Sequence, residues 1–129
     1  MLGSGEITVA LTVPPPPPHT GKVYLKHGRR KAMELATVGV AVAVTLAGGV
    51  CQRVRIALGA VAPTPIRARE AEALLQGTAL DEAAILAAAQ AAQAAARPIS
   101  DVRSSADYRR KMVGTLTARA LRAARQRAA

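Results

Sequence analysis

The chain has 129 residues, enough for one compact domain and too few for two. It carries 18 Lys and Arg residues against 8 Asp and Glu residues, a formal net charge of +10, and half of its residues are apolar although Phe and Trp are absent. The single cysteine, Cys51, excludes an internal disulfide and a cysteine-rich zinc site, and two histidines, His19 and His27, leave little for a metal site or a catalytic triad. A self-contained hydrolase or metalloenzyme is therefore not expected.

Residues 5–13 are predicted to form a first strand, because large apolar residues alternate there with Thr and Ala as on a half-buried strand. The large residues are Ile7, Val9, Leu11 and Val13. The prolines of residues 14–18 cannot donate backbone hydrogen bonds and favour polyproline II. Residues 14–21 are therefore expected to be a stiff, proline-rich connector.

Three antiparallel strands are expected within residues 22–60. The first, at residues 22–30, ends in a basic turn. The second, at about residues 36–46, is a valine ladder with Val at every second position, which favours a strand with one apolar face. The third covers residues 50–60, and the Gly-Gly pair before it supplies the positive φ angles of a tight reversal.

The uncharged stretch of residues 35–51 also resembles a short membrane span, because Arg29, Arg30 and Lys31 precede it. The alternation of Val with Gly, Ala and Thr places the large side chains on one face, which favours a strand over a membrane helix. The chain begins without a basic region followed by an apolar core, so no secretion signal is indicated. We therefore expect a cytoplasmic protein without a membrane partner.

Three helices are expected within residues 64–126. Thr64 precedes a proline at the first helical position and is expected to cap the first helix. The second helix is alanine-rich and covers about residues 81–96. The third begins at a capping box formed by Ser104 and Asp107.

Strands followed by helices indicate an α+β fold, in which an antiparallel sheet of three to four strands packs against three helices. All of this is expected to form a single domain over residues 1–129. Its core must be built from Ala, Val, Leu and Ile, so the domain is expected to be marginally stable alone and to use a partner surface.

No catalytic constellation is present among the residues. The carboxylates lie where helix starts and exposed helix faces accommodate them, and Cys51 has no neighbouring His or Lys, so it is expected to be a small packed thiol. The chain alone is therefore expected to hold no complete active site, and the question of enzyme activity stays open at this point.

Two basic clusters remain. Lys26, Arg29, Arg30 and Lys31 lie at the end of a strand, where a lysine can face an anion or an electron-rich ring edge, or be solvated. Residues 97–129 hold nine Lys or Arg residues and two carboxylates, so this segment can contact phosphates, dock on an acidic subunit, or form a solvated face. Nucleic acid is the least favoured partner, because stacking aromatics and a base-reading motif are absent.

Three segments, in their order and spacing, resemble the C-terminal domain of the flavoprotein subunit of the carbon monoxide dehydrogenase and xanthine dehydrogenase family. They are YLKHGRRKAM (residues 24–33), IALGAVAPTPIR (residues 56–67) and RPISDVRSSADYRR (residues 97–110). The resemblance covers about residues 5–124. It implies an antiparallel sheet backed by three helices, in agreement with the prediction from the patterns.

The resemblance implies a part in a molybdenum hydroxylase built from three kinds of subunit. In this family a molybdopterin subunit oxidises the substrate, an iron–sulfur subunit with two 2Fe–2S clusters carries the electrons, and the FAD subunit delivers them to an external acceptor. FAD is thus the cofactor implied for this chain, with molybdopterin and the 2Fe–2S clusters only in partner subunits. The alternative is a small basic nucleic-acid-binding protein that uses the Arg-rich C-terminal helix.

The resemblance also implies two cofactor-binding residues and no catalytic or metal-binding residue. Lys26 falls on the family's lysine that contacts the flavin, and Thr8 lies on the strand whose counterpart also approaches FAD. A lysine ammonium near the carbonyl and N1 side of the flavin would stabilise the anionic reduced ring. Arg29 and Arg30 follow on a loop that shapes access to the flavin in some relatives, and no contact is assigned to them.

The FAD subunit of the family is normally more than twice as long as this chain, and its N-terminal FAD-binding domain with its glycine-rich segments is absent here. We therefore expect a detached or truncated C-terminal domain that does not bind FAD tightly by itself. Its expected partners are the FAD-binding N-terminal half, the iron–sulfur subunit and the molybdopterin subunit. Asp101 and Arg103 in the third segment are expected to pair and to cap the last helix.

Overall fold

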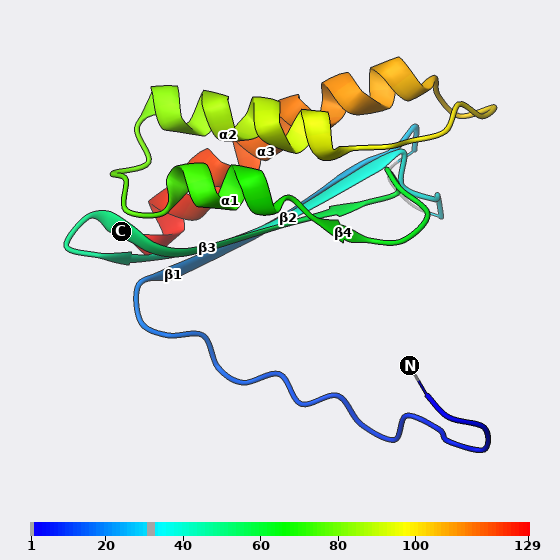
Figure 1. Ribbon diagram of the computed structural model, residues 1–129, viewed down its shortest axis with the longest axis horizontal. Helices are drawn as coiled ribbons and strands as arrows, with labels where there is room; N and C mark the ends of the chain where they lie inside the picture. Colours follow the sequence, from blue (N-terminus) through cyan, green and yellow to red (C-terminus); the bar gives the residue numbers. More distant parts are fainter. Residues whose placement is uncertain (1, 31–32) are drawn as a thin grey trace.

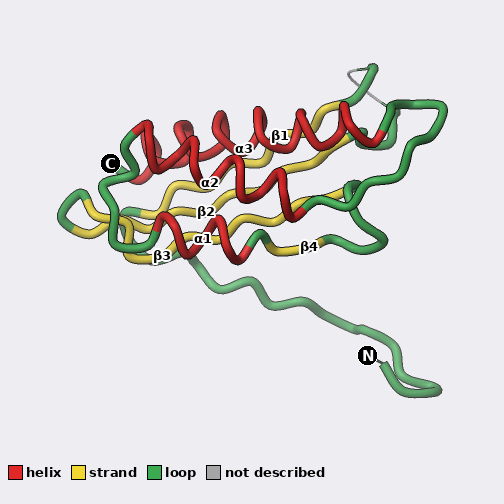
Figure 2. The backbone as a smooth tube through the Cα atoms, turned by 45° about the horizontal axis from the view of Figure 1, so that its top comes forward, coloured by secondary structure: helices red, strands yellow, loops and turns green. Residues whose placement is uncertain are grey.

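A four-stranded antiparallel sheet with its strands in sequence order forms one layer of the protein (Figure 1). The strands are β1 (Thr20–His27), β2 (Val38–Ala47), β3 (Val50–Gly59) and β4 (Ile66–Arg67). The helices form the second layer and cover one face of the sheet (Figure 2): α1 (Arg69–Leu75), α2 (Glu82–Ala95) and α3 (Ala106–Ala128). The computed structural model describes residues 2–30 and 33–129, and it confirms the predicted α+β class.

The valine ladder of β2 lies at the centre of the core. Its four valines are 0–3% exposed, and they are Val38, Val40, Val42 and Val44. The residues between them, such as Ala41 and Ala43, are half-buried and belong to the other face of the sheet, which the helices leave open. Because side chains alternate along a strand, β2 contributes its large side chains to one face only.

The rest of the core comes from β3 and from the inner faces of the helices. Large aliphatic side chains from each of these elements are at most 1% exposed, and they include Ile56, Leu58, Leu75, Ile85 and Leu121. Buried alanines of α2 and α3 fill the space between them. The core therefore consists of the small and aliphatic residues that the composition provides.

The turn between β2 and β3 has the predicted form. Gly48 and Gly49 have φ angles of +56° and +80°, and Ala47 pairs with Val50 across them. Positive φ at both central residues is typical of a type I′ hairpin turn, whose twist matches that of the flanking strands. The Gly-Gly pair thus sets the pairing of the residues next to the turn, and an irregularity between Thr45 and Leu46 shifts the register by one residue along the rest of the two strands.

The predicted first strand is wrong. Residues 6–13 pair with no strand among the described residues and run along the open side of the sheet, with their large apolar side chains 81–95% exposed (Figure 1). Alternation specifies which side chains share a face, but a strand also needs a neighbouring strand for its backbone bonds. The fourth strand is instead β4, whose Ile66 and Arg67 pair with Leu58 and Ala57.

The start of α1 also differs from the prediction. Thr64 does not cap this helix, because the pairing of residues 66–67 with β3 keeps the chain extended and the helix begins at Arg69. Tertiary pairing therefore overrides the local helix-start signal. By contrast, α2 begins where expected, and Asp81 caps it by accepting a hydrogen bond from the Ala84 backbone N–H at 2.8 Å.

The cap of α3 is Ser105 and not Ser104. The Ser105 hydroxyl oxygen accepts a hydrogen bond from the Tyr108 backbone N–H at 3.2 Å. Ser104 instead pairs through its backbone with Asp101 in the preceding loop. The predicted capping sequence is thus one residue away from the actual cap.

The close approach of β1 to α3 depends on Gly21. A Cβ atom at this position would lie 1.8 Å from the backbone carbonyl oxygen of Ala124, so the strand or the helix would have to shift. We predict that Gly21→Ala lowers the free energy of unfolding by about 3 kcal/mol, the upper part of the range for overpacked sites. Urea unfolding followed by circular dichroism measures the change.

Gly59→Ala is the matched control, because the nearest atom to a Cβ at this position is the Gly39 carbonyl oxygen at 4.0 Å. We expect this variant to remain within about 0.5 kcal/mol of the parent chain. Equal stabilities of the two variants would contradict the close contact between β1 and α3.

Candidate functional site

The C-terminal end of β1 opens into a cation-lined depression of about 360 Å³. It is lined by Lys26, His27, Gly28, Arg29 and Arg30. The side chains of the lysine and of both arginines are exposed, so three cations stand next to one another at this end of the sheet. Lys31, the fourth residue of the predicted basic cluster, lies outside the described residues.

Glu34 ties together the loop that follows β1. Its carbonyl oxygen accepts a hydrogen bond from Lys26 Nζ at 2.6 Å, and its carboxylate accepts from Arg29 Nε at 3.4 Å and from the Arg30 backbone N–H. Burial by itself would raise the pKa of Glu34, but these hydrogen bonds and the charges of the two arginines outweigh it and lower the pKa. Glu34 is therefore the ionised counter-charge within this cationic loop.

Contacts to β2 and α3 fix the position of the end of β1. The Thr37 backbone N–H donates to the His27 carbonyl oxygen at 2.8 Å, which closes the loop between β1 and β2. The Tyr108 hydroxyl of α3 lies 3.2 Å from His27 Nε2, with the two ring centroids 5.8 Å apart. Lys26, the residue before His27, thus projects from a strand end that is held on both sides.

Arg109 of α3 binds the same end of the sheet from inside. Its side chain is 5% exposed. Nη1 donates to the carbonyl oxygens of Thr37 at 3.0 Å and Ala60 at 3.2 Å, and Nη2 donates to Asp101 Oδ1 at 2.7 Å. One guanidinium group therefore joins the start of β2, the end of β3 and the loop between α2 and α3.

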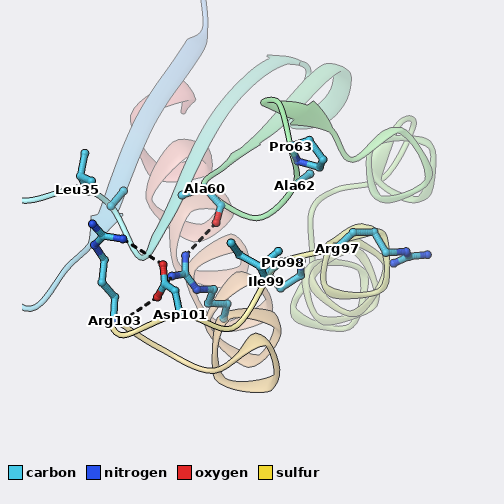
Figure 3. A pocket seen from close by; sticks show the side chains of 11 residues that line it. Leu35, Ala60, Ala62, Pro63, Arg97, Pro98, Ile99, Asp101 and Arg103 are labelled. Atoms are coloured by element: carbon cyan, nitrogen blue, oxygen red, sulfur yellow. Dashed lines mark hydrogen bonds and ion pairs between the residues drawn. The ribbon is translucent and has the colours of Figure 1, made fainter.

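Asp101 is the anionic partner in this group (Figure 3). It accepts hydrogen bonds from the backbone N–H groups of Arg103 at 2.8 Å and Ser104 at 3.2 Å, and Arg103 Nη1 lies 3.1 Å from Oδ2. The hydrogen bond from the Arg103 backbone, together with that from Arg109, lowers the pKa of Asp101 to about 2 although partial burial opposes this. The expected pairing of Asp101 with Arg103 is confirmed, but Ser105 and not Asp101 caps α3.

An apolar pocket of about 570 Å³ lies beside this pair of charges (Figure 3). Its apolar lining comes from three loops: Leu35, Ala36, Ala60, Ala62, Pro63, Pro98 and Ile99. Leu35 is 66% exposed and Ile99 is 73% exposed, so the rim of the pocket is apolar as well. Leu35 directly follows Glu34, which places this apolar rim next to the cationic loop.

The structure does not bring Thr8 to Lys26. Thr8 lies in the exposed segment of residues 6–13 and does not line the depression at the end of β1, whereas Lys26 does. Of the two residues implied for the cofactor, Lys26 belongs to the cation-lined depression and Thr8 does not.

Most of the cations in residues 97–129 bond to carbonyl or carboxylate groups of the chain itself. Seven of the nine do so: Arg97, Arg103, Arg109, Arg110, Arg122, Arg125 and Arg127. Arg125 Nη1, for example, donates to the Leu80 carbonyl oxygen at 2.6 Å. Most cations of this segment therefore already have a partner within the chain.

Cys51 is a buried core residue, as predicted, and its burial raises the pKa of the thiol. Nowhere in residues 2–30 and 33–129 do three His, Cys, Asp or Glu side chains come together as a metal site would require. Among the helices of the same residues, none combines the length and the apolar character needed to cross a membrane.

Sequence and fold together define the class of protein. The family model described as the CO dehydrogenase flavoprotein C-terminal domain matches residues 23–124. The chain therefore belongs to this family, and the resemblance seen in the three sequence segments is confirmed.

Individual relatives show what the family includes. The carbon monoxide dehydrogenase medium chain of Hydrogenophaga pseudoflava is 40% identical over 129 residues, which are 100% of this chain and 45% of that protein. The xanthine dehydrogenase FAD-binding subunit of Escherichia coli is 34% identical over 117 residues, 90% of this chain and 40% of the subunit. This chain thus spans less than half the length of these relatives.

A solved structure supports the same relationship. Carbon monoxide dehydrogenase from Hydrogenophaga pseudoflava, in a form that lacks the Mo-pyranopterin moiety of the molybdenum cofactor, is similar to this chain with a TM-score of 0.87 and 44% sequence identity. The match covers 91% of this chain and 40% of that chain. Most of the fold described above therefore has a counterpart within a longer chain of that enzyme.

The sequence singles out Lys26 as a candidate but does not reveal the residues that hold it in place. Glu34 gave a weak signal, as a lone carboxylate after a run of cations. Tyr108 and Arg109 lie in the third family segment, but their role depends on contacts that are distant in sequence, such as the bond from Arg109 to Thr37 across 72 residues. No local pattern reports a contact of this kind.

The low pKa of Asp101 predicts a specific acid sensitivity. A carboxyl group whose pKa is lower in the folded than in the unfolded chain stabilises the fold above its unfolded pKa and loses this contribution as the pH falls toward its folded pKa. With values of 3.8 and about 2, the loss for Asp101 falls between about pH 4 and pH 2. We expect Asp101→Asn to be less stable than the parent at pH 7 and to show a flatter decline in this pH range, measured by urea unfolding.

Asp107→Asn is the control for this experiment, because Asp107 also pairs with an arginine, Arg110, but its side chain is 93% exposed. An exposed pair contributes little to stability. We expect this variant to follow the parent at every pH. Parallel curves for Asp101→Asn and the parent between pH 4 and pH 2 would contradict the assigned role of Asp101.

Proposed function

We propose that this chain forms one wall of the FAD site in the flavoprotein subunit of a molybdenum hydroxylase, with Lys26 as the side chain nearest to the flavin ring. The observation that carries the proposal is the exposed, cation-lined end of β1 in a chain that belongs to this flavoprotein family. A relative with 34% identity is named as an FAD-binding subunit. FAD would accept electrons there and pass them on, chemistry that none of the side chains can supply.

The residues at the end of β1 fit one edge of an electron-accepting ring. Lys26 has three N–H donors on its ammonium group, and the Glu34 carbonyl oxygen uses one of them. The others remain available for an acceptor in the depression. A cation about 4 Å from a unit negative charge stabilises it by about 4 kcal/mol at an effective dielectric constant of 20, so a ring that gains electrons would be favoured beside Lys26.

The same geometry argues against tight FAD binding by this chain alone. The depression is open and measures about 360 Å³, and it offers cations without an enclosing apolar surface. Ligand sites usually bury most of their ligand. The rest of the site is proposed to come from the FAD-binding part that makes up more than half of the relatives. Thr8 would approach FAD only if its segment packs against that part.

Docking of further subunits is the second part of the proposed role. The apolar rim formed by Leu35 and Ile99 lies beside the cationic loop and suits a protein contact. We assign to it a neighbour in the assembled enzyme, in which an iron–sulfur subunit passes electrons from a molybdopterin subunit to the flavin. The rigid fold of this chain would hold the flavin edge at a fixed place in that path.

Lys26→Ala tests the flavin-facing role. The experiment uses a hybrid protein, referred to below as the chimera. In it, the 129 residues of this protein replace the matching 45% of the Hydrogenophaga medium chain. We expect the reduction potential of its FAD to fall by about 30 mV or more, since about 1.4 kcal/mol corresponds to 30 mV for a two-electron couple. Spectroelectrochemical titration of the bound flavin measures the shift.

Lys111→Ala, which removes an exposed lysine of α3, is the control and is expected to leave the potential unchanged. The chain alone is expected to show no FAD binding at micromolar concentrations in a fluorescence titration. An unchanged potential in Lys26→Ala would remove Lys26 from the site, and tight FAD binding by the chain alone would contradict the one-wall geometry.

A further inference from the structure

The cation-lined depression at the end of β1 also contains an imidazole. His27 lines it together with Lys26, Gly28, Arg29 and Arg30. Lysine and arginine side chains keep their charge at neutral pH, whereas imidazole is the side chain whose charge ordinarily changes in this range. Among the described residues that line the depression, His27 is thus the one that can take up a proton, and the flavin contact proposed for Lys26 does not use it.

His27 stands next to Lys26 but is held by a different part of the fold. The two residues are consecutive in β1, so their side chains leave the strand on opposite faces. The Lys26 side chain is exposed, whereas His27 is half-buried and its Nε2 atom lies 3.2 Å from the Tyr108 hydroxyl of α3. One ring nitrogen is therefore held by α3 while the imidazole still contacts solvent.

The contact between His27 and Tyr108 suits both charge states of the imidazole. A hydroxyl group both donates and accepts hydrogen bonds. The Tyr108 hydroxyl donates to Nε2 when this nitrogen carries no proton and accepts from Nε2 when it carries one. The backbone of His27 is held as well, because its carbonyl oxygen accepts from the Thr37 N–H at 2.8 Å. A proton gained by His27 would therefore place its charge at a fixed position in the depression.

The loop and the strand beside His27 offer it no free anion among the described residues. The loop after β1 contributes three cations and one carboxylate, and these are Lys26, Arg29, Arg30 and Glu34. The Glu34 carboxylate is already paired with Arg29. On β2 the residue opposite His27 is Val38, which is uncharged.

The charged groups of α3 and of the loop before it are also paired. Next to Tyr108 there are two ion pairs and, one turn later, an exposed lysine: Asp107–Arg110, Asp101–Arg109 and Lys111. Each carboxylate around His27 in the described part of the chain thus has an arginine partner. A negative charge that develops in the depression would be the counter-charge that a protonated His27 lacks.

We propose that His27 takes up a proton when the flavin ring beside Lys26 is reduced, so that the end of β1 couples electron uptake to proton uptake. The inference rests on the proposed function, because it needs FAD in the depression. On reduction by the iron–sulfur subunit, the ring takes up two electrons and one proton and keeps one negative charge, while His27 takes a second proton from solvent. The site then gains two electrons and two protons, and its net charge does not change.

The size of the coupling follows from the dimensions of the depression. At an effective dielectric constant of about 20, opposite unit charges about 9 Å apart, the width of a depression of about 360 Å³, change a proton affinity about twentyfold. The effect is reciprocal, because the charge that favours the proton on His27 is itself favoured by that proton to the same extent. Protonation of His27 would therefore raise the reduction potential of the ring.

Three forms of the chimera test the coupling: the parent, His27→Gln and His27→Lys. Gln keeps a hydrogen-bonding partner for Tyr108 without a charge, and Lys carries a lasting charge. Spectroelectrochemical titrations over about pH 5.5 to 9 measure the potential of the bound FAD. We expect the two variants to differ by about 40 mV, which is the twentyfold change converted at about 30 mV per tenfold for two electrons.

The parent is expected to join the two variants across the pH range. At the acid end its potential should coincide with that of His27→Lys, and at the alkaline end with that of His27→Gln, because His27 is charged at one end and neutral at the other. A parent whose potential stays at a constant distance from both variants at every pH would overturn the proposal.

His19→Gln is the matched control, because it removes the other histidine of the chain. His19 precedes β1, whose eight residues span about 26 Å, so it lies at the far end of the strand from the depression. Charges this far apart are largely screened at physiological salt. We expect this variant to follow the parent at every pH. The same effect in His19→Gln and His27→Gln would overturn the assignment to His27.

NMR of the chimera with carbon-13-labelled histidine reports the proton directly. The His27 signal is the one that is missing in His27→Gln. We expect half-protonation of His27 at a proton concentration about twentyfold lower when the flavin is reduced with dithionite than when it is oxidised. An identical titration of this signal in both redox states would overturn the proposal.

Failure of this inference and failure of the proposed function give different results. If FAD binds elsewhere, Lys26→Ala and both His27 variants leave its potential unchanged, which overturns both. If FAD lies beside Lys26 and His27 takes no proton, Lys26→Ala lowers the potential while the His27 variants stay parallel to the parent. This second result overturns only the coupling.

Discussion

A buried guanidinium group holds together the end of the molecule that carries the candidate site. Arg109 donates to carbonyl groups at the start of β2 and after β3 and to the Asp101 carboxylate. Removal of one partner from a buried charge pair typically lowers the stability of the fold by about 3–5 kcal/mol. The contacts of Arg109 therefore hold these segments in place around α3. The loop that contains Glu34 ends at Thr37, which is one of the partners of Arg109. Because Lys26 bonds to the Glu34 carbonyl oxygen, Lys26 is anchored to the same point.

The surplus of positive charge has two separate uses. On the helical side, arginines bond to backbone carbonyl groups of loops and of the ends of helices. Arg125, for example, donates to Leu80 in the loop before α2. At the end of β1 and on the open face of the sheet, Lys26, Arg53 and Arg55 stay exposed. Net charge alone suggested a polyanionic partner such as nucleic acid. The distribution of the charge instead leaves exposed cations on the side away from the helices, where the flavin and its other binding part are proposed to lie.

The parts of the fold that the sequence predicts are those whose signal is local. The valine ladder, the Gly48–Gly49 turn and the start of α2 each depend on neighbouring residues, and each forms as expected. The error at residues 6–13 has a physical cause, because a pattern of side chains does not reveal whether a sheet edge is within reach. For the site, the family motif supplied Lys26, but the partners of Arg109 come from segments far apart in sequence and are visible only in the fold.

The distribution of apolar surface shows how this domain can form a closed core of its own while it still exposes surface for a neighbouring part of a flavoprotein. The open face of the sheet has small residues such as Ala41 and Ala57 between charged side chains, and an antiparallel sheet of this kind tolerates water on one side. Among the described residues, most of the large apolar side chains that are more than 60% exposed lie outside the sheet, in residues 6–13 and at Met33, Leu35, Ile99 and Val102, whereas Tyr24 is 63% exposed on the open face. A neighbour that covers them would make a contact between domains and would not extend the core. The chain can therefore fold around its own valines, while the proposed cofactor site needs a second wall from another part of the flavoprotein.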